Sequence, residues 1–174
     1  MGPFSPSSFY TEESILAYLK VHGISYTVFH HPAVYTSAEA DVYTANLPGF
    51  RAKNLFLSNN DETRHYLYIC HENQRANLKQ LAKIMNDSRL RFGNERNLVD
   101  FLGITAGAIS LLALVNDPFN RIRVIIEDEV LQAESVQLHP LVNTATVIIS
   151  REGLKEFLSV TGHSIFHLNG NPTV

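Results

Sequence analysis

The sequence predicts a single domain of the mixed α/β class. Short apolar runs typical of buried strands alternate along the chain with segments whose apolar residues recur at helical spacing. With 174 residues, 45% of them apolar and 18% charged, the chain has the length and composition of a globular domain that buries a core. No repeat or linker divides it. We therefore expect a loose leader over residues 1–9 and one domain over 10–174.

The first expected elements are a helix, a strand and a shorter helix. Thr11, followed by acidic residues, is typical of a helix N-cap and predicts a helix over 11–22. Apolar residues over 26–29 predict a short strand, which Pro32 ends because proline cannot donate a ladder hydrogen bond. The segment 36–39 (Thr-Ser-Ala-Glu) has the form of a capping box and predicts a short helix.

The middle of the chain predicts a hairpin and two helices. Two apolar runs, 53–57 and 65–70, are separated by a short polar turn and are expected to form buried strands. Apolar residues at helical spacing after the cap-like Asn77 predict the next helix. The segment 94–102 predicts another helix, which Gly103 ends.

The last third begins with an unusual segment and ends with core elements. Residues 103–114 are small, apolar and nearly uncharged. The segments 123–127 and 144–149 predict core strands, followed by a helix over 151–160 and a short strand at 165–168.

Charge and composition exclude several classes of partner. Fourteen Lys and Arg against seventeen Asp and Glu give a net charge of −3, so any contact with nucleic acid must be local. A solvated helical face is the favoured interpretation of the basic residues that are candidates for phosphate contacts, Lys79, Lys83, Arg89, Arg91 and Arg96. No run approaches the ~20 apolar residues that span a bilayer, and the N-terminus lacks a signal peptide. We expect a cytoplasmic protein.

The motifs of metal, ATP and nucleophilic chemistry are absent. None of the eight histidines forms a zinc-binding pattern on a helix, and the single cysteine cannot build a zinc site, so we expect no metal and no cofactor. No Lys-Ser/Thr pair follows Gly107, which excludes a P-loop. Ser110 lacks the Gly-x-Ser-x-Gly elbow and Cys70 lies in an apolar run, so neither is favoured as a nucleophile.

Three features carry candidate chemistry when each is taken alone. Lys53 begins an apolar strand, where a lysine must reach solvent or find an anionic partner. The Gly103-x-x-x-Gly107 spacing leaves backbone N–H groups close to the surface for an oxyanion or a phosphate. His139 lies in a turn that leads into a strand. Each feature also has a purely structural interpretation. Lys53 is then a lysine exposed to water, the two glycines allow helices to pack closely, and His139 is a histidine whose ring is hydrogen-bonded within the fold.

Five segments together carry a resemblance that no single one carries. They are 29–36 (Phe-His-His-Pro-Ala-Val-Tyr-Thr), 53–57 (Lys-Asn-Leu-Phe-Leu), 103–110 (Gly-Ile-Thr-Ala-Gly-Ala-Ile-Ser), 116–117 (Asn-Asp) and 139–146 (His-Pro-Leu-Val-Asn-Thr-Ala-Thr). In order and spacing they resemble the YbaK/ProX family of aminoacyl-tRNA editing domains, over nearly the whole chain after the leader. The Asn-Asp pair is more similar to the freestanding ProX branch than to the YbaK branch.

The resemblance implies a barrel-like mixed α/β fold and a trans-editing deacylase. Such an enzyme hydrolyses the ester between a wrong amino acid and tRNA with a positioned water, without metal, cofactor or covalent nucleophile. The ProX branch implies alanyl-tRNA(Pro) as substrate, and the alternatives are a cysteinyl-tRNA(Pro) deacylase of the YbaK type or a non-catalytic module that binds tRNA or a synthetase. A hydrolase using Ser110 or Cys70 is a further rival. The implied partners are the acceptor end of mischarged tRNA and prolyl-tRNA synthetase or an elongation factor, with no DNA and no membrane.

The resemblance also assigns roles to individual residues. The implied catalytic residues are Lys53, which holds the tRNA terminus or stabilises negative charge, the loop residues Gly107 and Ala108, whose backbone binds the reacting ester, and the pocket residue His139. The implied substrate-binding residues are Phe29, His31, Val34, Thr36, Asn54 and Ser110. Ala106 and Leu111 stand where the family often has proline, a departure that bears on the stiffness of the loop and on the preference for an amino acid.

Overall fold

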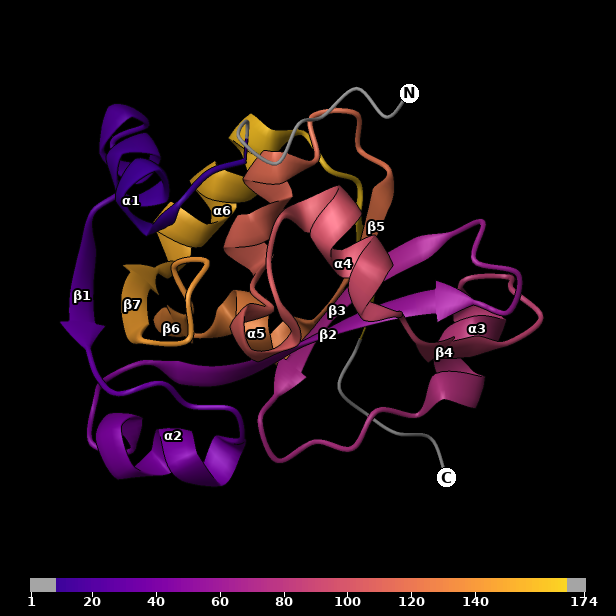
Figure 1. The fold of residues 1–174 in the computed structure, drawn as a ribbon, viewed down its shortest axis with the longest axis horizontal. Helices are drawn as coiled ribbons and strands as arrows, with labels where there is room; N and C mark the ends of the chain where they lie inside the picture. The colour runs from indigo at the N-terminus through magenta and orange to yellow at the C-terminus, as the bar shows by residue number, and fades with distance from the viewer. Residues whose placement is uncertain (1–8, 169–174) are drawn as a thin grey trace.

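Eight strands pair into one mixed sheet in the computed structural model, which describes residues 9–168 (Figure 1). The strands are β1 (Tyr26–His30), β2 (Phe50–Asn59), β3 (His65–His71), β4 (Leu90–Phe92), β5 (Ile122–Glu127), β6 (Ser135–Leu138), β7 (Ala145–Ser150) and β8 (Ile165–Leu168). Their order is β1-β7-β6-β2-β3-β5-β8, and β4 pairs with β2. The expected mixed α/β class is confirmed, and the described pairings follow an open path from β1 to β8.

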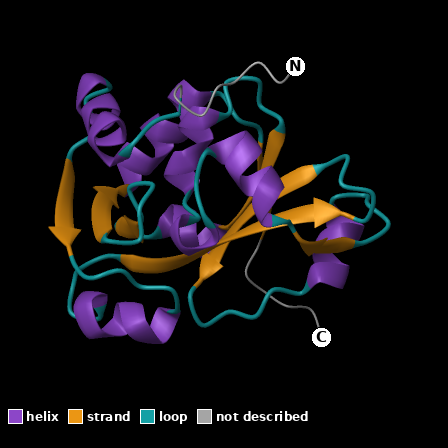
Figure 2. Cartoon of the chain, in the orientation of Figure 1, coloured by secondary structure: helices purple, strands orange, loops and turns teal. Residues whose placement is uncertain are grey.

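Six α-helices and two 3-10 helices are described around this sheet (Figure 2). They are α1 (Glu12–Val21), α2 (Ser37–Thr44), α3 (Leu78–Ile84), α4 (Glu95–Leu102), η2 (Ala106–Ala108), η3 (Leu111–Asn116), α5 (Asp128–Gln132) and α6 (Arg151–Thr161). Figure 1 shows α2, in purple, apart from the other helices. Among residues 9–168, no helix is long and apolar enough to cross a membrane.

The helices begin and end where the sequence provides caps. Thr11 and Thr36 each cap their helix through a capping box, as expected for α1 and α2. Gly103 and Gly162 end α4 and α6 in the left-handed conformation, with φ of 64° and 73°. Glycine adopts this conformation without a steric penalty, which is why it is common after a helix.

The sheet separates two hydrophobic cores. Side chains alternate along a strand, so Leu67 and Ile69 of β3 face the main core. Tyr66, Tyr68 and Cys70, on the other face of β3, pack in the second core with residues of α3. Burial on both faces explains why this strand is an unbroken apolar run in the sequence.

The two ends of β2 have different neighbours. Phe50 and Arg51 pair in parallel with β6, and Leu57 to Asn59 pair with β4. Between them, β3 lies along one edge of β2, and the other edge pairs with no described strand. Because β6 pairs with only two residues before it diverges, the sheet opens beside Lys53 and Asn54.

The expected elements are present, and three short ones were not predicted. β4, α5 and β6 have three, five and four residues, which is too short for a periodic pattern of apolar residues to be recognised in the sequence. The apolar segment 103–114 forms η2 and most of η3. The basic residues between 79 and 96 do not share one helical face, because they are divided among α3, β4 and α4 and the turns between them. Of the expected leader, residues 1–8 lie outside the described residues.

Candidate active site

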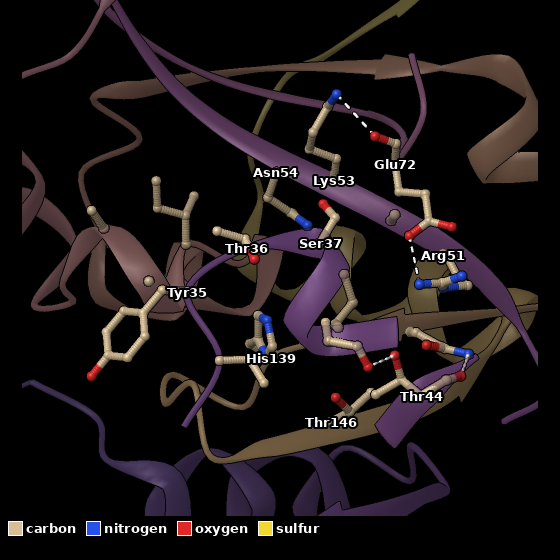
Figure 3. A pocket seen from close by; sticks show the side chains of 18 residues that line it. Tyr35, Thr36, Ser37, Thr44, Arg51, Lys53, Asn54, Glu72, His139 and Thr146 are labelled. Atoms are coloured by element: carbon tan, nitrogen blue, oxygen red, sulfur yellow. Dashed lines mark hydrogen bonds and ion pairs between the residues drawn. The ribbon is translucent and has the colours of Figure 1, made fainter. Parts of the chain in front are cut away.

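A cavity of about 190 Å³ lies where β2 and β6 diverge. It is walled by β2, by the turn after β6, by η2, and by α2 with the segment that precedes it (Figure 3). Six of the ten residues expected at the site line it: Val34, Thr36, Lys53, Asn54, Gly107 and His139. These six come from four separate parts of the chain.

Lys53 is held by the loop that follows β3. Its Nζ donates a hydrogen bond to the carbonyl oxygen of Glu72, at 3.0 Å, and another to the carbonyl of Gln74. Figure 3 shows the side chain extending from β2 toward the Glu72 carbonyl. Two neutral acceptors orient the ammonium group without neutralising its charge, so a positive charge remains at the cavity wall.

Gln74 is itself fixed by a buried polar group. Its Nε2 donates to Glu127 Oε1 and to Tyr68 Oη, both at 3.1 Å, and Tyr68 Oη donates to the same Glu127 oxygen at 2.6 Å. Burial, followed by the hydrogen bond to Glu127, raises the pKa of Tyr68, so the phenol remains a donor. The loop that receives Lys53 is thereby anchored to β3 and β5.

Asn54 connects β2 to the apolar segment on the other side. Its Oδ1 accepts a hydrogen bond from the N–H of Leu111, the first residue of η3, at 2.9 Å. The contact fixes the segment that carries Gly107 against the strand that carries Lys53. Its role in this structure is therefore to position the loop.

The glycine segment presents backbone N–H groups at the start of η2. Ala106 and Gly107 line the cavity, and none of the described hydrogen bonds uses their N–H groups. An N–H group at the start of a helix has no partner within that helix. A side chain at Gly107 would lie 3.2 Å from Asn143 Nδ2 and 3.3 Å from the Tyr35 ring, so glycine permits this close approach.

Ala108 is placed differently from the expectation. It is 3% exposed, it does not line the cavity, and its N–H donates to the Thr105 carbonyl at 3.0 Å. The structure thus brings Gly107 and Ala106, rather than Gly107 and Ala108, to the cavity.

His139 is neutral, and its tautomer is fixed. Nδ1 lies 2.9 Å from the carbonyl oxygen of Ala145, so Nδ1 carries the proton and donates it. Burial lowers the pKa of His139; the hydrogen bond to Ala145 opposes this shift and the nearby His31 adds to it. The remaining nitrogen, Nε2, is therefore a hydrogen-bond acceptor at neutral pH.

The start of α2 forms the opposite wall. Thr36 Oγ1 accepts from the Glu39 N–H at 3.2 Å, so this hydroxyl caps the helix. Val34 is buried, and its N–H donates to the Asn143 carbonyl at 3.1 Å. Tyr35 is 74% exposed, and Figure 3 shows its ring directed away from Lys53.

Three further expected residues do not line the cavity. Phe29 is on β1, paired with Thr146 of β7. His31 lies behind the same threonine, with Nε2 3.0 Å from Thr146 Oγ1. Ser110 is fully buried, and its Oγ accepts from the Leu112 N–H at 3.2 Å. Thr146 therefore separates the first two from the cavity, and Ser110 caps η3.

The structure disfavours a nucleophilic serine or cysteine. Ser110 and Cys70 are both fully buried, and neither lines the cavity. Burial raises the pKa of the Cys70 thiol to about 11, against a smaller opposing effect of Lys53, so the thiolate is disfavoured. Among residues 9–168, no group of three or more His, Cys, Asp and Glu side chains is arranged to hold a metal ion.

Several cavity residues were missed in the sequence. They include Tyr35, Arg51, Glu72, Ala106, Gln137 and Thr146. Arg51 and Lys53 share a face of β2 because they are two residues apart, and two cations at the start of an apolar strand were a usable signal. Thr146 lies in one of the segments that carry the resemblance. Glu72 and Gln137 had no local signal.

The fold and cavity define a structural class, the small mixed α/β domains with one eight-stranded sheet that opens at a cavity. The fold is similar to the crystal structure of a candidate trans-editing enzyme for prolyl-tRNA synthetase, with a TM-score of 0.67 and 18% identity over 94% of this chain and 100% of that one. At this level of identity, the comparison shows the fold alone.

The chain belongs to the aminoacyl-tRNA editing domain family, whose model matches residues 31–157. It is similar to the prolyl-tRNA editing protein ProX of Acetoanaerobium sticklandii, with 29% identity over 88% of this chain and 93% of the relative. It is also similar to the prolyl-tRNA synthetase associated domain-containing protein 1 of Xenopus laevis, with 30% identity over 87% of this chain and 92% of the relative.

Proposed function

We propose that the chain is a trans-editing deacylase that hydrolyses mischarged aminoacyl-tRNA, with alanyl-tRNA(Pro) as its substrate. The observation that carries the proposal is that one small cavity combines a charged lysine, a neutral histidine and two N–H groups without partners among the described residues. Membership of the editing family and the similarity to a prolyl-tRNA editing protein support it.

The chemistry requires little from the protein because an aminoacyl ester is already activated. Water attacks the carbonyl carbon, and the N–H groups of Gly107 and Ala106 stabilise the oxyanion that forms. The bond to the ribose oxygen then breaks, and that oxygen takes up the proton lost by the water. His139 Nε2 orients the water or a ribose hydroxyl by accepting a hydrogen bond. Lys53 binds the terminal phosphate or the developing negative charge.

Selection among amino acids comes from the size of the cavity. A volume of about 190 Å³ must hold the aminoacyl group together with the reacting water. We expect this small cavity to admit alanine and to exclude the larger proline ring by steric clash, and a clash discriminates more sharply than a missing methylene. Cysteine and serine are the alternative small residues that the cavity admits.

The net charge of the protein bears on how the tRNA reaches the cavity. The net charge of −3 attracts a polyanion only weakly. We therefore expect the substrate to arrive through prolyl-tRNA synthetase or an elongation factor, in the cytoplasm where tRNA is charged. Adding either protein is expected to lower the KM for the mischarged tRNA.

The test is amino-acid release from separately prepared alanyl-, cysteinyl- and seryl-tRNA(Pro), with prolyl-tRNA(Pro) as the correctly charged control. We expect rapid release of alanine, and Lys53→Ala should lower kcat/KM at least about 100-fold, as removal of one charge-stabilising group does in other hydrolases. Lys155→Ala, which removes an exposed lysine from α6, is the matched control and should keep full activity. Circular dichroism establishes that both variants fold.

The other outcomes distinguish the alternatives. Preferential release of cysteine or serine keeps the enzyme class and changes the substrate. Full activity of a folded Lys53→Ala variant removes the lysine from the mechanism. Absence of release from every substrate, by a folded protein that binds tRNA, would replace the deacylase with a non-catalytic module.

A further inference from the structure

Glu72 is the acidic residue in the wall of the cavity; no other aspartate or glutamate of the described residues lines it. It follows β3, and its side chain is 13% exposed. Its two polar ends have different partners: the carbonyl oxygen accepts from Lys53, and the carboxylate binds Arg51, with Oε2 2.8 Å from Nη2 (Figure 3). None of the described hydrogen bonds or ion pairs involves Oε1.

Arg51 does not fully neutralise the Glu72 carboxylate, because it also binds a second carboxylate. The same Nη2 also pairs with Asp41 of α2, so one guanidinium is shared between two carboxylates. The three groups together carry one excess negative charge. Asp41 is 52% exposed and is screened by water, whereas the less exposed Glu72 faces the cavity. The excess negative charge of these three groups therefore lies at the cavity wall, beside the positive charge of Lys53.

The proposed substrate carries the complementary charge. An amino acid attached to tRNA through its carboxyl group keeps a free α-amino group, which is largely protonated near neutral pH because such amines have a pKa of about 7.7–8.0. The substrate thus brings a cation on the amino acid and an anion on the terminal phosphate. The cavity offers Glu72 for the first and Lys53 for the second, from adjacent positions joined by a 3.0 Å hydrogen bond.

We propose that Glu72 binds the α-ammonium group of the aminoacyl ester, and that Arg51 holds its carboxylate in place. This inference rests on the proposed deacylase function. Glu72 then makes the enzyme specific for esters with a free, protonated α-amino group. With the ammonium bound at Glu72 and the phosphate end at Lys53, the carbonyl carbon between them has one orientation toward Gly107.

The test compares two esters of the same tRNA(Pro) that differ in one group. Alanyl-tRNA carries the ammonium, and lactyl-tRNA, prepared from it by deamination, carries a hydroxyl of similar size. Each rate is divided by the uncatalysed rate of the same ester. We expect the wild type to prefer the alanyl ester about 10- to 100-fold in kcat/KM, the range for a hydrogen bond to a charged group.

Glu72→Gln keeps the size of the side chain and removes its charge. It is expected to lower the rate on the alanyl ester to that on the lactyl ester and to leave the lactyl rate unchanged. Glu134→Gln, at an exposed glutamate outside the cavity, is the matched control and should keep the preference. Thermal unfolding followed by circular dichroism establishes that both variants fold.

Two results would overturn the proposal. One is equal acceleration of both esters by the wild type, a comparison that needs no variant and so does not depend on folding. The other is a folded Glu72→Gln variant that keeps the preference for alanyl-tRNA. Both results leave the deacylase function intact. If the enzyme accelerates neither the alanyl nor the lactyl ester, the proposed function and this inference are both wrong.

Discussion

At His139, burial and one hydrogen bond decide both the charge and the tautomer. A histidine in a turn is usually a structural residue or a solvated one, and its sequence neighbours do not distinguish these cases. The Ala145 carbonyl takes the Nδ1 proton, and burial keeps the ring neutral. The ring therefore presents an acceptor at the pH at which the proposed reaction runs.

The rate of deacylation should depend on pH through this ring. Because the pKa of His139 is lowered from 6.5, the neutral form persists below that pH. We expect kcat/KM, divided by the uncatalysed rate, to stay constant as pH falls to 6.5 and to decrease only below it. His139→Gln should be slower and should lack this acidic limb. An acidic limb centred above 6.5 would contradict the assignment.

Asn54 contributes to stability through a single acceptor. Asn54→Ala removes the oxygen that accepts from the Leu111 N–H and leaves that donor unpaired in a partly buried site. The expected loss in free energy of unfolding is about 1–3 kcal/mol. Urea titration measures it, and Asn60→Ala in the exposed hairpin turn is the control, expected to have little effect. Equal effects of the two variants would show that the hydrogen bond contributes nothing.

At the scale of elements, α2 is the most weakly held wall of the cavity. Thr44 is its only buried residue, so the helix depends on its capping box, on the Asp41 ion pair to Arg51, and on a hydrogen bond from Gln137 to the Thr44 carbonyl. A helix that buries so little apolar surface is expected to open locally without unfolding the domain. Local opening of α2 would also disturb the cavity, because the first turn of α2 lines it.

The two capping boxes allow a matched comparison. Thr36→Ala should lose about 0.5–2 kcal/mol of helix stability, the usual cost of a missing N-cap. Because α2 lines the cavity, we expect faster hydrogen exchange in α2 and a lower deacylation rate. Thr11→Ala breaks the equivalent box of α1, which does not line the cavity, and should leave the rate unchanged. A similar loss of activity in both variants would refute a local role of α2.

At the scale of the whole molecule, one buried carboxylate joins elements far apart in sequence. Asp117 follows η3 and accepts from the Ile122 N–H of β5 at 2.7 Å, from Arg121 Nε at 3.1 Å, and from His163 Nε2, also 3.1 Å away, in the turn after α6. Burial alone would raise its pKa, but these hydrogen bonds outweigh burial and lower it. The carboxylate therefore remains charged inside the protein.

Removing this carboxylate should destabilise the whole domain. Asp117→Ala leaves its buried partners uncompensated and is expected to cost about 3–5 kcal/mol in the free energy of unfolding. A lowered pKa in the folded state gives stability that is present above the unfolded value, about 3.9, and is lost as pH falls through the folded value. Acid titration of unfolding should show this loss in the wild type and not in Asp117→Asn. Superimposable acid profiles would contradict it.

The sequence by itself determined the local structure and the residues with a distinctive local setting. Capping boxes, periodic apolar runs and terminal glycines act over a few residues, so α1, β3 and α6 were predicted close to their observed bounds, and α2 was predicted at its start. Lys53 and His139 were identified because the surrounding segments resemble those of an editing family.

Only the tertiary structure decided which residues share the cavity. Phe29 and Ser110 belong to the right segments, yet Phe29 lies on β1, paired with Thr146, and Ser110 is fully buried as the N-cap of η3. Glu72 reaches the cavity because the β2–β3 register sets it opposite Arg51, whose carbonyl accepts its N–H. Gln137 reaches it because β6 pairs in parallel with the first residues of β2 and then diverges from it. That register joins positions more than eighty residues apart, and packing over the whole chain fixes it, so no local pattern encodes it.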